Sequence, residues 1–133
     1  MDDLYTDSAK RVMAIAQEQA NYFRHQAIGT EHLLLALTIE DKGVAGQVLK
    51  QAMVTPGDVR REIERLAGYG NLLRQSPSNY LPYSPKAKAV LDETRKQAFL
   101  TGAVRIGTEH FLLALLSDED ILSSRILTSL HVD

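Results

Sequence analysis

Apolar residues recur every three or four positions along residues 9–23, which predicts an amphipathic helix of about four turns. Thr6 stands just before this segment, where a hydroxyl side chain is preferred as a helix N-cap. A similar pattern follows Ser84 and Pro85, and a hydroxyl residue followed by proline is a typical helix start. We therefore expect two long helices with equivalent starts.

Shorter helices are expected after each long one. Residues 33–37 and 111–116 are apolar on every face, which is typical of a short helix buried among others. A third helix is predicted at 44–52, with a matching one at 122–130. A fourth opens at Thr55-Pro56-Gly57-Asp58 and should bury Val59, Ile63, Leu66 and Ala67. No alternating strand pattern competes, so the predicted fold class is all-α.

The sequence contains an internal repeat. The segment Ile-Gly-Thr-Glu-His occurs at 28–32 and again at 106–110, and an ungapped shift of 78 residues makes 17 of 52 pairs identical. We expect a single domain, 1–133, built as a pseudo-two-fold tandem repeat of two small four-helix units. Repeat one spans 4–67, a linker spans 68–81 and repeat two spans 82–133, with the last helix of the second unit missing or truncated.

Composition narrows the function classes. Fifteen Lys and Arg against 17 Asp and Glu give a net charge of −2, which disfavours a nucleic-acid partner. Without cysteine, the chain has no disulfide and no thiolate chemistry. The sequence has neither a signal-peptide pattern nor an 18-residue apolar run, so we expect a cytoplasmic protein that does not enter a membrane.

Catalytic and cofactor motifs are also missing. There is no phosphate-binding loop and no His-Glu-x-x-His zinc motif, so we expect no cofactor, no metal and no catalysis. A remote alternative is a small helical nuclease built around Arg105, Glu109 and His110. It is weakened because the first repeat has Ala27 at the position of Arg105.

The doubled block resembles a known family. The first repeat is similar to the Clp repeat: a capped helix is followed by Ile-Gly-Thr-Glu-His-Leu-Leu-Leu-Ala-Leu and then by Gly43-Val44-Ala45. The Clp repeat is found twice in the N-terminal domain of Clp AAA-plus unfoldases. The residues here most resemble those of the ClpC type. The resemblance covers residues 4–133. The second repeat departs from it at 117–124, where the glycine and Val-Ala signature is lost, and no AAA-plus module follows. The chain is then either an excised domain or a stand-alone relative.

This resemblance implies a non-catalytic domain that binds adaptor proteins and protein substrates. Through a parent chain it would serve an AAA-plus ring coupled to the ClpP peptidase. ClpC-type domains are also associated with phosphoarginine, a degradation mark on proteins. An alternative with the same fold is an adaptor-docking module without a small-ligand pocket. The segment at 80–83, with two tyrosines, either contacts an adaptor or covers the second repeat.

The candidate binding residues are the copied helix starts. If Thr30 and Thr108 are N-caps, Glu31 and Glu109 lie in the first helical turn, where backbone N–H groups favour an anion. Phosphoarginine needs donors for its phosphate and an acceptor for its guanidinium, and such a helix start offers both. The same residues also suit a purely architectural helix start.

Four more residues complete the candidate sites. Lys10 and Lys88 lie one turn into the first helix of each repeat and could supply a cation for a phosphate. Thr6 and Ser84 could donate a hydroxyl hydrogen bond to the same group. The neighbouring His32 and His110 are expected to be core residues instead.

Overall fold

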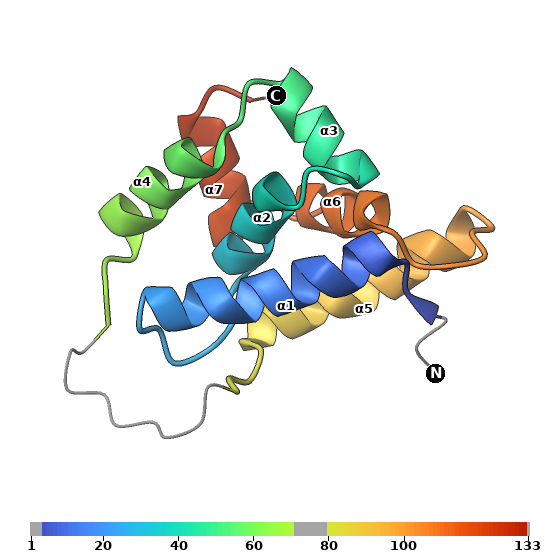
Figure 1. Ribbon diagram of the computed structural model, residues 1–133, viewed down its shortest axis with the longest axis horizontal. Coiled ribbons are helices and arrows are strands. Elements are labelled where there is room, and N and C mark those ends of the chain that lie inside the picture. The colour runs from blue at the N-terminus through green and yellow to red at the C-terminus, as the bar shows by residue number, and fades with distance from the viewer. Residues whose placement is uncertain (1–3, 71–79, 133) are drawn as a thin grey trace.

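The computed structural model describes residues 4–70 and 80–132, and in this part of the chain it is built from helices. The helices are α1 (Asp7–Tyr22), α2 (Thr30–Ile39), α3 (Val44–Gln51), α4 (Pro56–Leu66), α5 (Pro85–Leu100), α6 (Thr108–Leu116) and α7 (Leu122–Ser129) (Figure 1). The all-α prediction is confirmed. None of the described helices is long and apolar enough to cross a lipid bilayer.

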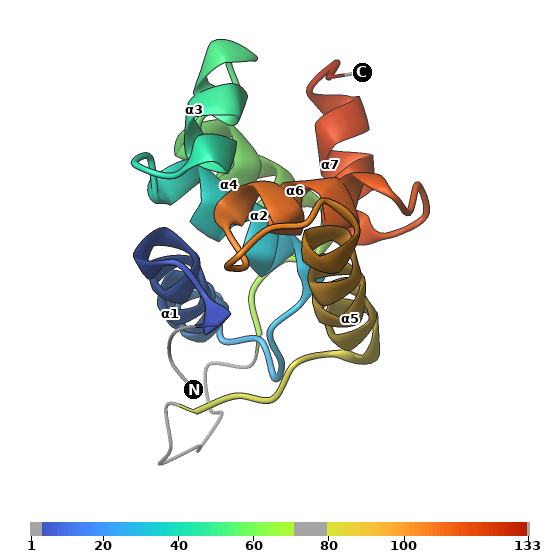
Figure 2. The same ribbon diagram turned by 90° about the vertical axis from the view of Figure 1, so that its right-hand side faces the viewer.

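The helices of the two repeats correspond one to one over most of the chain. α5, α6 and α7 begin 78 residues after α1, α2 and α3, respectively, whereas α4 has no counterpart among the described residues. α2 and α6 contact each other, α1 packs on α2, and α5 packs on α6. In Figure 2, α1 and α5 lie on opposite sides below this central pair, with α3 and α7 above it. This arrangement is consistent with the expected pseudo-two-fold repeat.

The N-caps predicted for three helices are confirmed. The side-chain oxygens of Thr6, Ser84 and Thr55 each accept a hydrogen bond, 3.1 Å long, from the backbone N–H three residues later. Each such cap stabilises a helix by about 1 kcal/mol relative to alanine.

The N-caps predicted for α2 and α6 are wrong. The cap positions belong to Gly29 and Gly107, and the threonines are the first helical residues. The backbone N–H of each glycine donates to Nδ1 of the histidine three residues later, His32 or His110, at 2.8 Å. The histidine ring thus accepts the backbone N–H of the cap residue, and the threonine hydroxyl is available for another contact.

Each of these threonines caps a helix of the other repeat. Thr30 Oγ1 accepts a hydrogen bond of 3.2 Å from the N–H of Ser123, at the start of α7. Thr108 Oγ1 accepts one of 3.1 Å from the N–H of Ala45, at the start of α3. Both threonines are buried. The two repeats are therefore tied together by a pair of equivalent bonds.

The chain that leads into α1 and α5 is also held by the other repeat. Thr6 donates its N–H to the carbonyl of Ile106 at 2.9 Å, and Ile106 donates to Leu4 at 2.8 Å. Equivalent bonds join Ser84 and Pro82 to Ile28, at 2.9 and 2.8 Å. Both bridges are parallel. The start of each long helix therefore lies beside the segment that leads into α2 or α6 of the other repeat.

The core follows the predicted pattern only in part, and each repeat departs from it in one place. Residues 33–37 are completely buried, as expected. In the other apolar run, Leu113 and Leu116 are exposed. Leu66, which ends α4, and Ala67, which follows it, are also exposed although predicted to be buried. The exposed leucines of α6 lie where no counterpart of α4 is described.

The linker prediction, 68–81, lies mostly outside the described residues. Its described ends are packed on the protein: Gly70 donates its N–H to the carbonyl of Phe23 at 2.8 Å, and Leu81 is buried. Tyr80 is exposed and Tyr83 is half-buried, so the segment that they flank is divided between core and surface.

Candidate functional site

Two pairs of helix starts form the candidate sites. Because Thr6 is bonded to Ile106, the start of α1 lies beside the segment that opens α6, which carries Glu109. Likewise, the bond from Ser84 to Ile28 brings the start of α5 beside the segment that opens α2, which carries Glu31. Each site therefore combines a hydroxyl from one repeat with a glutamate from the other. The sequence alone did not indicate this exchange.

Both glutamates fold back over the start of their own helix. The Glu31 side chain is 13% exposed, and a Cβ atom placed on Gly29 would stand 2.1 Å from Glu31 Oε1. A Cβ atom placed on Gly107 would stand 2.3 Å from Glu109 Oε1. A glycine at each cap thus leaves room for the carboxylate. The carboxylate lies where the helix dipole favours an anion.

Burial raises the pKa of Glu31 above its ordinary value, while a hydrogen bond with its own backbone and the nearby His25 act in the opposite direction. The carboxylate is therefore partly desolvated in its folded-back position. An external cation that reaches it would form a stronger contact than it would with a fully hydrated carboxylate.

A chain of histidines lies behind the first glutamate. His32 Nε2 is 2.7 Å from His25 Nδ1, and His25 Nε2 is 2.7 Å from the carbonyl oxygen of Gly68. Since Gly29 donates to Nδ1 of His32, the bonds assign the proton of His32 to Nε2, which donates to His25, and His25 donates to Gly68. Burial, followed by the nearby His25, lowers the pKa of His32 to about 3. The prediction that His32 is a core residue is confirmed, whereas His25 was missed.

The two sites differ behind their glutamates. In the second repeat, His110 is also buried, but its Nε2 lies 3.3 Å from Thr101 Oγ1, and Ala103 stands at the position of His25. The nuclease alternative gains no support: Arg105 is exposed, whereas His110 is buried and bonded to Gly107.

His25, Glu31 and His32 could each offer one metal-ligand atom, and these atoms lie within 4.8 Å of one another. However, both nitrogens of each imidazole already take part in the hydrogen-bond chain that ends at Gly68. A metal ion would have to replace these bonds. The geometry therefore favours a structural role for the two histidines over metal binding.

The remaining candidate residues fall into two groups. Thr6 and Ser84 accept a bond from the backbone, which leaves their own hydroxyl hydrogens able to donate. Lys10 and Lys88 are exposed, and Nζ of Lys10 lies 4.0 Å from Oδ1 of Asp7. By contrast, Thr30 and Thr108 are only 2% and 1% exposed and are used between the repeats. They position the helices and do not face a surface ligand.

Comparison with known proteins identifies the architecture. The Clp repeat (R) N-terminal domain matches residues 4–130. The chain belongs to this family. It is 36% identical over 128 residues to the negative regulator of genetic competence ClpC/MecB of Bacillus subtilis, and 38% identical over 128 residues to ClpC of Staphylococcus aureus strain USA300. Each alignment covers 96% of this chain but 15% of the relative, so the chain spans a small part of those proteins.

Solved structures show the same fold. The Clp N-terminal domain superposes on that of ClpD from Arabidopsis thaliana with a TM-score of 0.81, 22% identity and coverage of 98% and 86% of the two chains. For the Hsp104 N-terminal domain of Candida albicans the TM-score is 0.74, with 22% identity and coverage of 97% and 83%. The family and fold inferred from the doubled block are confirmed.

Proposed function

We propose that this Clp N-terminal domain recognises adaptor proteins and protein substrates for a Clp ATPase, and that its two paired helix starts bind phosphoarginine. The observation that carries the proposal is the exchange between repeats. The bonds of Thr6 to Ile106 and of Ser84 to Ile28 join the start of each long helix to the segment that leads into the helix carrying a glutamate of the other repeat, which supports a site shared between the two.

The folded-back carboxylates give the proposal a mechanism. In their folded-back positions, the carboxylates of Glu31 and Glu109 occupy the place where an anion would bind at the helix starts that follow Gly29 and Gly107. When a guanidinium draws Glu31 or Glu109 outward, the N–H groups of that first turn become available to a phosphate. One movement of a single side chain thus prepares both halves of the ligand's site.

The cations and hydroxyls stand on the opposite helix of each pair. Ser84 and Lys88, on α5, would hold the phosphate of a ligand whose guanidinium meets Glu31. Thr6 and Lys10, on α1, would do the same for a ligand at Glu109. Two weak sites on one rigid domain favour substrates that carry several marks, because binding at one site raises the effective concentration at the other.

The wider assignment rests on the relatives. ClpC of Staphylococcus aureus is named as an ATP-binding subunit of an ATP-dependent Clp protease. By analogy, we place the domain in the cytoplasm, where it would deliver substrates to an AAA-plus ring and the ClpP peptidase.

The test is calorimetric titration of the 133-residue chain with free phosphoarginine. We expect saturable heat, and a Kd at least about tenfold weaker for Glu31→Ala with Glu109→Ala, because a charge-assisted hydrogen bond contributes about 1.5–3 kcal/mol. Glu18→Ala with Glu64→Ala, two exposed glutamates of α1 and α4, is the matched control. No saturable heat, or heat unchanged by the first pair of substitutions, would overturn the phosphoarginine sites. Adaptor capture that survives those substitutions would then favour the docking module without a small-ligand pocket.

A further inference from the structure

A small apolar hollow lies at the end of α5, where the chain turns towards α6. It measures about 210 Å³, and the residues that line it include Leu4, Phe99, Val104, Arg95 and Arg105. Val104 is 95% exposed, Phe99 is 84% exposed and Leu4 is 50% exposed, so these apolar side chains face solvent. Figure 1 shows the loop after α5 projecting from the edge of the molecule. We call this site the α5 hollow.

The first repeat shows that the fold does not require an apolar surface at this place. The exposed positions of the α5 hollow carry polar or small residues there: Phe99 corresponds to Asn21, Val104 to Gln26 and Arg105 to Ala27. The buried positions beneath them are identical in the two repeats, with alanine at 98 and 20 and isoleucine at 106 and 28. Folding alone therefore accounts for the buried residues of the hollow but not for its exposed apolar ones.

The exposure of the α5 hollow does not depend on a helix equivalent to α4. Among the described residues of the first repeat, α4 contacts α2 but not α1, which is the counterpart of α5. Gln26, the counterpart of Val104, is exposed although α4 and the following residues up to Gly70 are in place. A helix in the position of α4 would therefore leave Val104 exposed.

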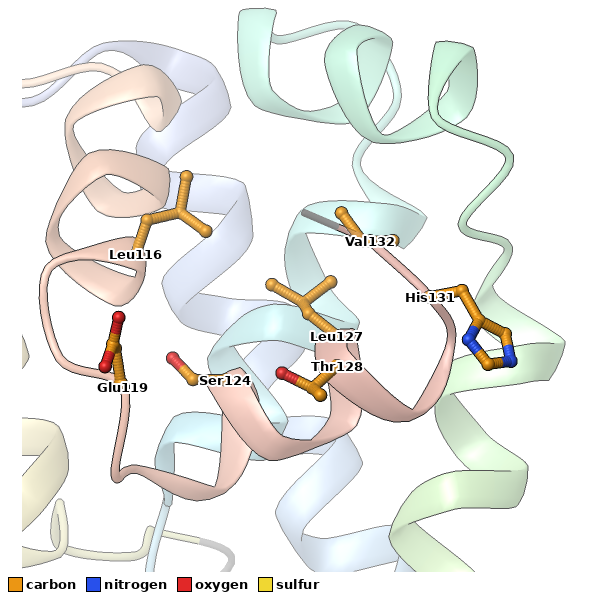
Figure 3. A pocket seen from close by; sticks show the side chains of 7 residues that line it. All are labelled: Leu116, Glu119, Ser124, Leu127, Thr128, His131 and Val132. Carbon is orange, nitrogen blue, oxygen red and sulfur yellow. The ribbon is translucent and has the colours of Figure 1, made fainter.

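A larger hollow of the second repeat differs in this respect. It measures about 550 Å³ and lies between the end of α6 and α7, where Leu116, Glu119 and Leu127 line it (Figure 3). The equivalent hollow of the first repeat, about 410 Å³, is lined in part by Pro56 and Arg60 of α4. Because α4 shapes this surface in the first repeat, the larger hollow is no evidence for a ligand.

The charged residues at the α5 hollow are both basic. Arg95 and Arg105 line it, and no acidic residue of the described chain does. Arg95 is paired with Asp92 on the same helix, whereas Arg105 takes part in no hydrogen bond or ion pair within the described part of the protein. A free guanidinium offers its N–H donors to a carboxylate. The α5 hollow therefore suits an apolar side chain that has an acidic group beside it.

The size and position of the α5 hollow also indicate its occupant. Pockets for small molecules typically measure about 300–1,000 Å³, so a hollow of about 210 Å³ suits a single side chain. The carbonyl of Leu4 accepts a hydrogen bond of 2.8 Å from Ile106, and the carbonyl of Ile106 accepts one of 2.9 Å from Thr6. Thr6 belongs to the phosphoarginine site proposed at Glu109. Since Leu4 and Thr6 are two residues apart, at most about 7 Å along an extended chain, the hollow borders that site.

We propose that the α5 hollow binds an apolar side chain of a protein substrate, two residues from a phosphoarginine, and that an acidic neighbour of this side chain meets Arg105. Side chains two residues apart face the same side of an extended chain, so such a substrate presents both groups to the domain at once. The inference rests on the proposed function, because the phosphoarginine lies at Glu109. In the first repeat polar residues stand in place of the apolar ones, so the site at Glu31 binds phosphoarginine without regard to the sequence around it.

A titration of the Glu31→Ala variant, which keeps the site at Glu109, tests the inference. The probes are fluorescein-labelled peptides that contain phosphoarginine-Gly-Phe-Asp or Asp-Phe-Gly-phosphoarginine, and binding is followed by anisotropy. In one of the two orders we expect a Kd at least about fivefold lower than for the peptide in which serine and asparagine replace phenylalanine and aspartate. Phe99→Asn with Val104→Gln should remove this gain, and the fold should be kept because the first repeat carries these residues at the same positions. Arg105→Ala should remove only the part of the gain that requires aspartate rather than asparagine in the probe.

Free phosphoarginine separates the two possible failures. It should bind the Glu31→Ala variant equally well with and without Phe99→Asn and Val104→Gln, and Met53→Gln, at a residue that is 82% exposed on the α3–α4 connection, is the matched control for the peptides. If free phosphoarginine binds but neither peptide order gives a gain, the α5 hollow is overturned as a binding site while the proposed function stands. No saturable binding of free phosphoarginine would overturn both. A gain that survives Phe99→Asn with Val104→Gln would overturn the hollow, and so would a dimer in light scattering that these changes abolish, by assigning the hollow to a second copy.

Discussion

The bonds of Thr30 and Thr108 across the repeats should matter more than ordinary surface caps. Replacement by valine keeps the shape of the side chain and removes the oxygen that accepts the N–H of Ser123 or Ala45. That N–H is then left inside the protein without its partner, and an unsatisfied buried donor costs about 1–3 kcal/mol. For a chain of 133 residues the unfolding entropy is about 0.28 kcal/mol/K, so each substitution should lower Tm by about 4–11 °C.

The assay is thermal unfolding followed by circular dichroism at the helix band, with urea unfolding at 25 °C as a second measure. Thr128→Val is the matched control because Thr128 is exposed on α7. It should change the free energy of unfolding by less than about 0.5 kcal/mol. If Thr30→Val and Thr108→Val were no more destabilising than this control, the bonds between the repeats would contribute little to stability.

Three further predictions concern the core and the first site. The pKa of His32 is about 3 in the folded protein and 6.5 in the unfolded chain, so the unfolded chain binds more protons and stability is lost as pH falls from about 6.5 towards 3. Urea unfolding should therefore show about 1 kcal/mol less stability at pH 5.5 than at pH 7. The stability of His32→Gln should depend less on pH. Gly29→Ala should push the Glu31 carboxylate outward and lower the free energy of unfolding. In a double-mutant cycle this loss should be smaller in the Glu31→Ala background. Equal losses in the two backgrounds would contradict the close approach of the Glu31 carboxylate to Gly29. Phe23→Ala should lower the free energy of unfolding by about 3–5 kcal/mol, because Phe23 is completely buried. Phe99→Ala, at a residue that is 84% exposed, should lower it by less than about 0.5 kcal/mol. Similar losses for the two variants in urea unfolding would contradict the described core.

Features with local causes were predictable from the sequence. The N-caps of Thr6, Thr55 and Ser84 depend on bonds to residues three positions away, and the sequence indicated all three. The cap predicted for Thr30 was wrong because its hydroxyl bonds to Ser123, which is 93 residues away. His25 was missed for a similar reason, since its role depends on Gly68, which is 43 residues away.

The candidate site shows the same limit. The repeated block pointed to Glu31 and Glu109, but only the bridges at Ile28 and Ile106 show that the segment leading into each glutamate's helix lies beside the start of the long helix of the other repeat. The exposure of Leu113 was also unpredictable from periodicity, because the run at 111–116 looks as apolar as the buried run at 33–37. Whether a neighbouring helix covers such a run is a property of the whole fold.

The parallel bridges at Ile28 and Ile106 also bear on how the domain comes apart. The segment entering α1 can keep its hydrogen bonds only while the other half of the molecule is in place, and the same holds for α5. Neither half can melt and leave its mate intact, so heat or denaturant should produce a single cooperative transition rather than two.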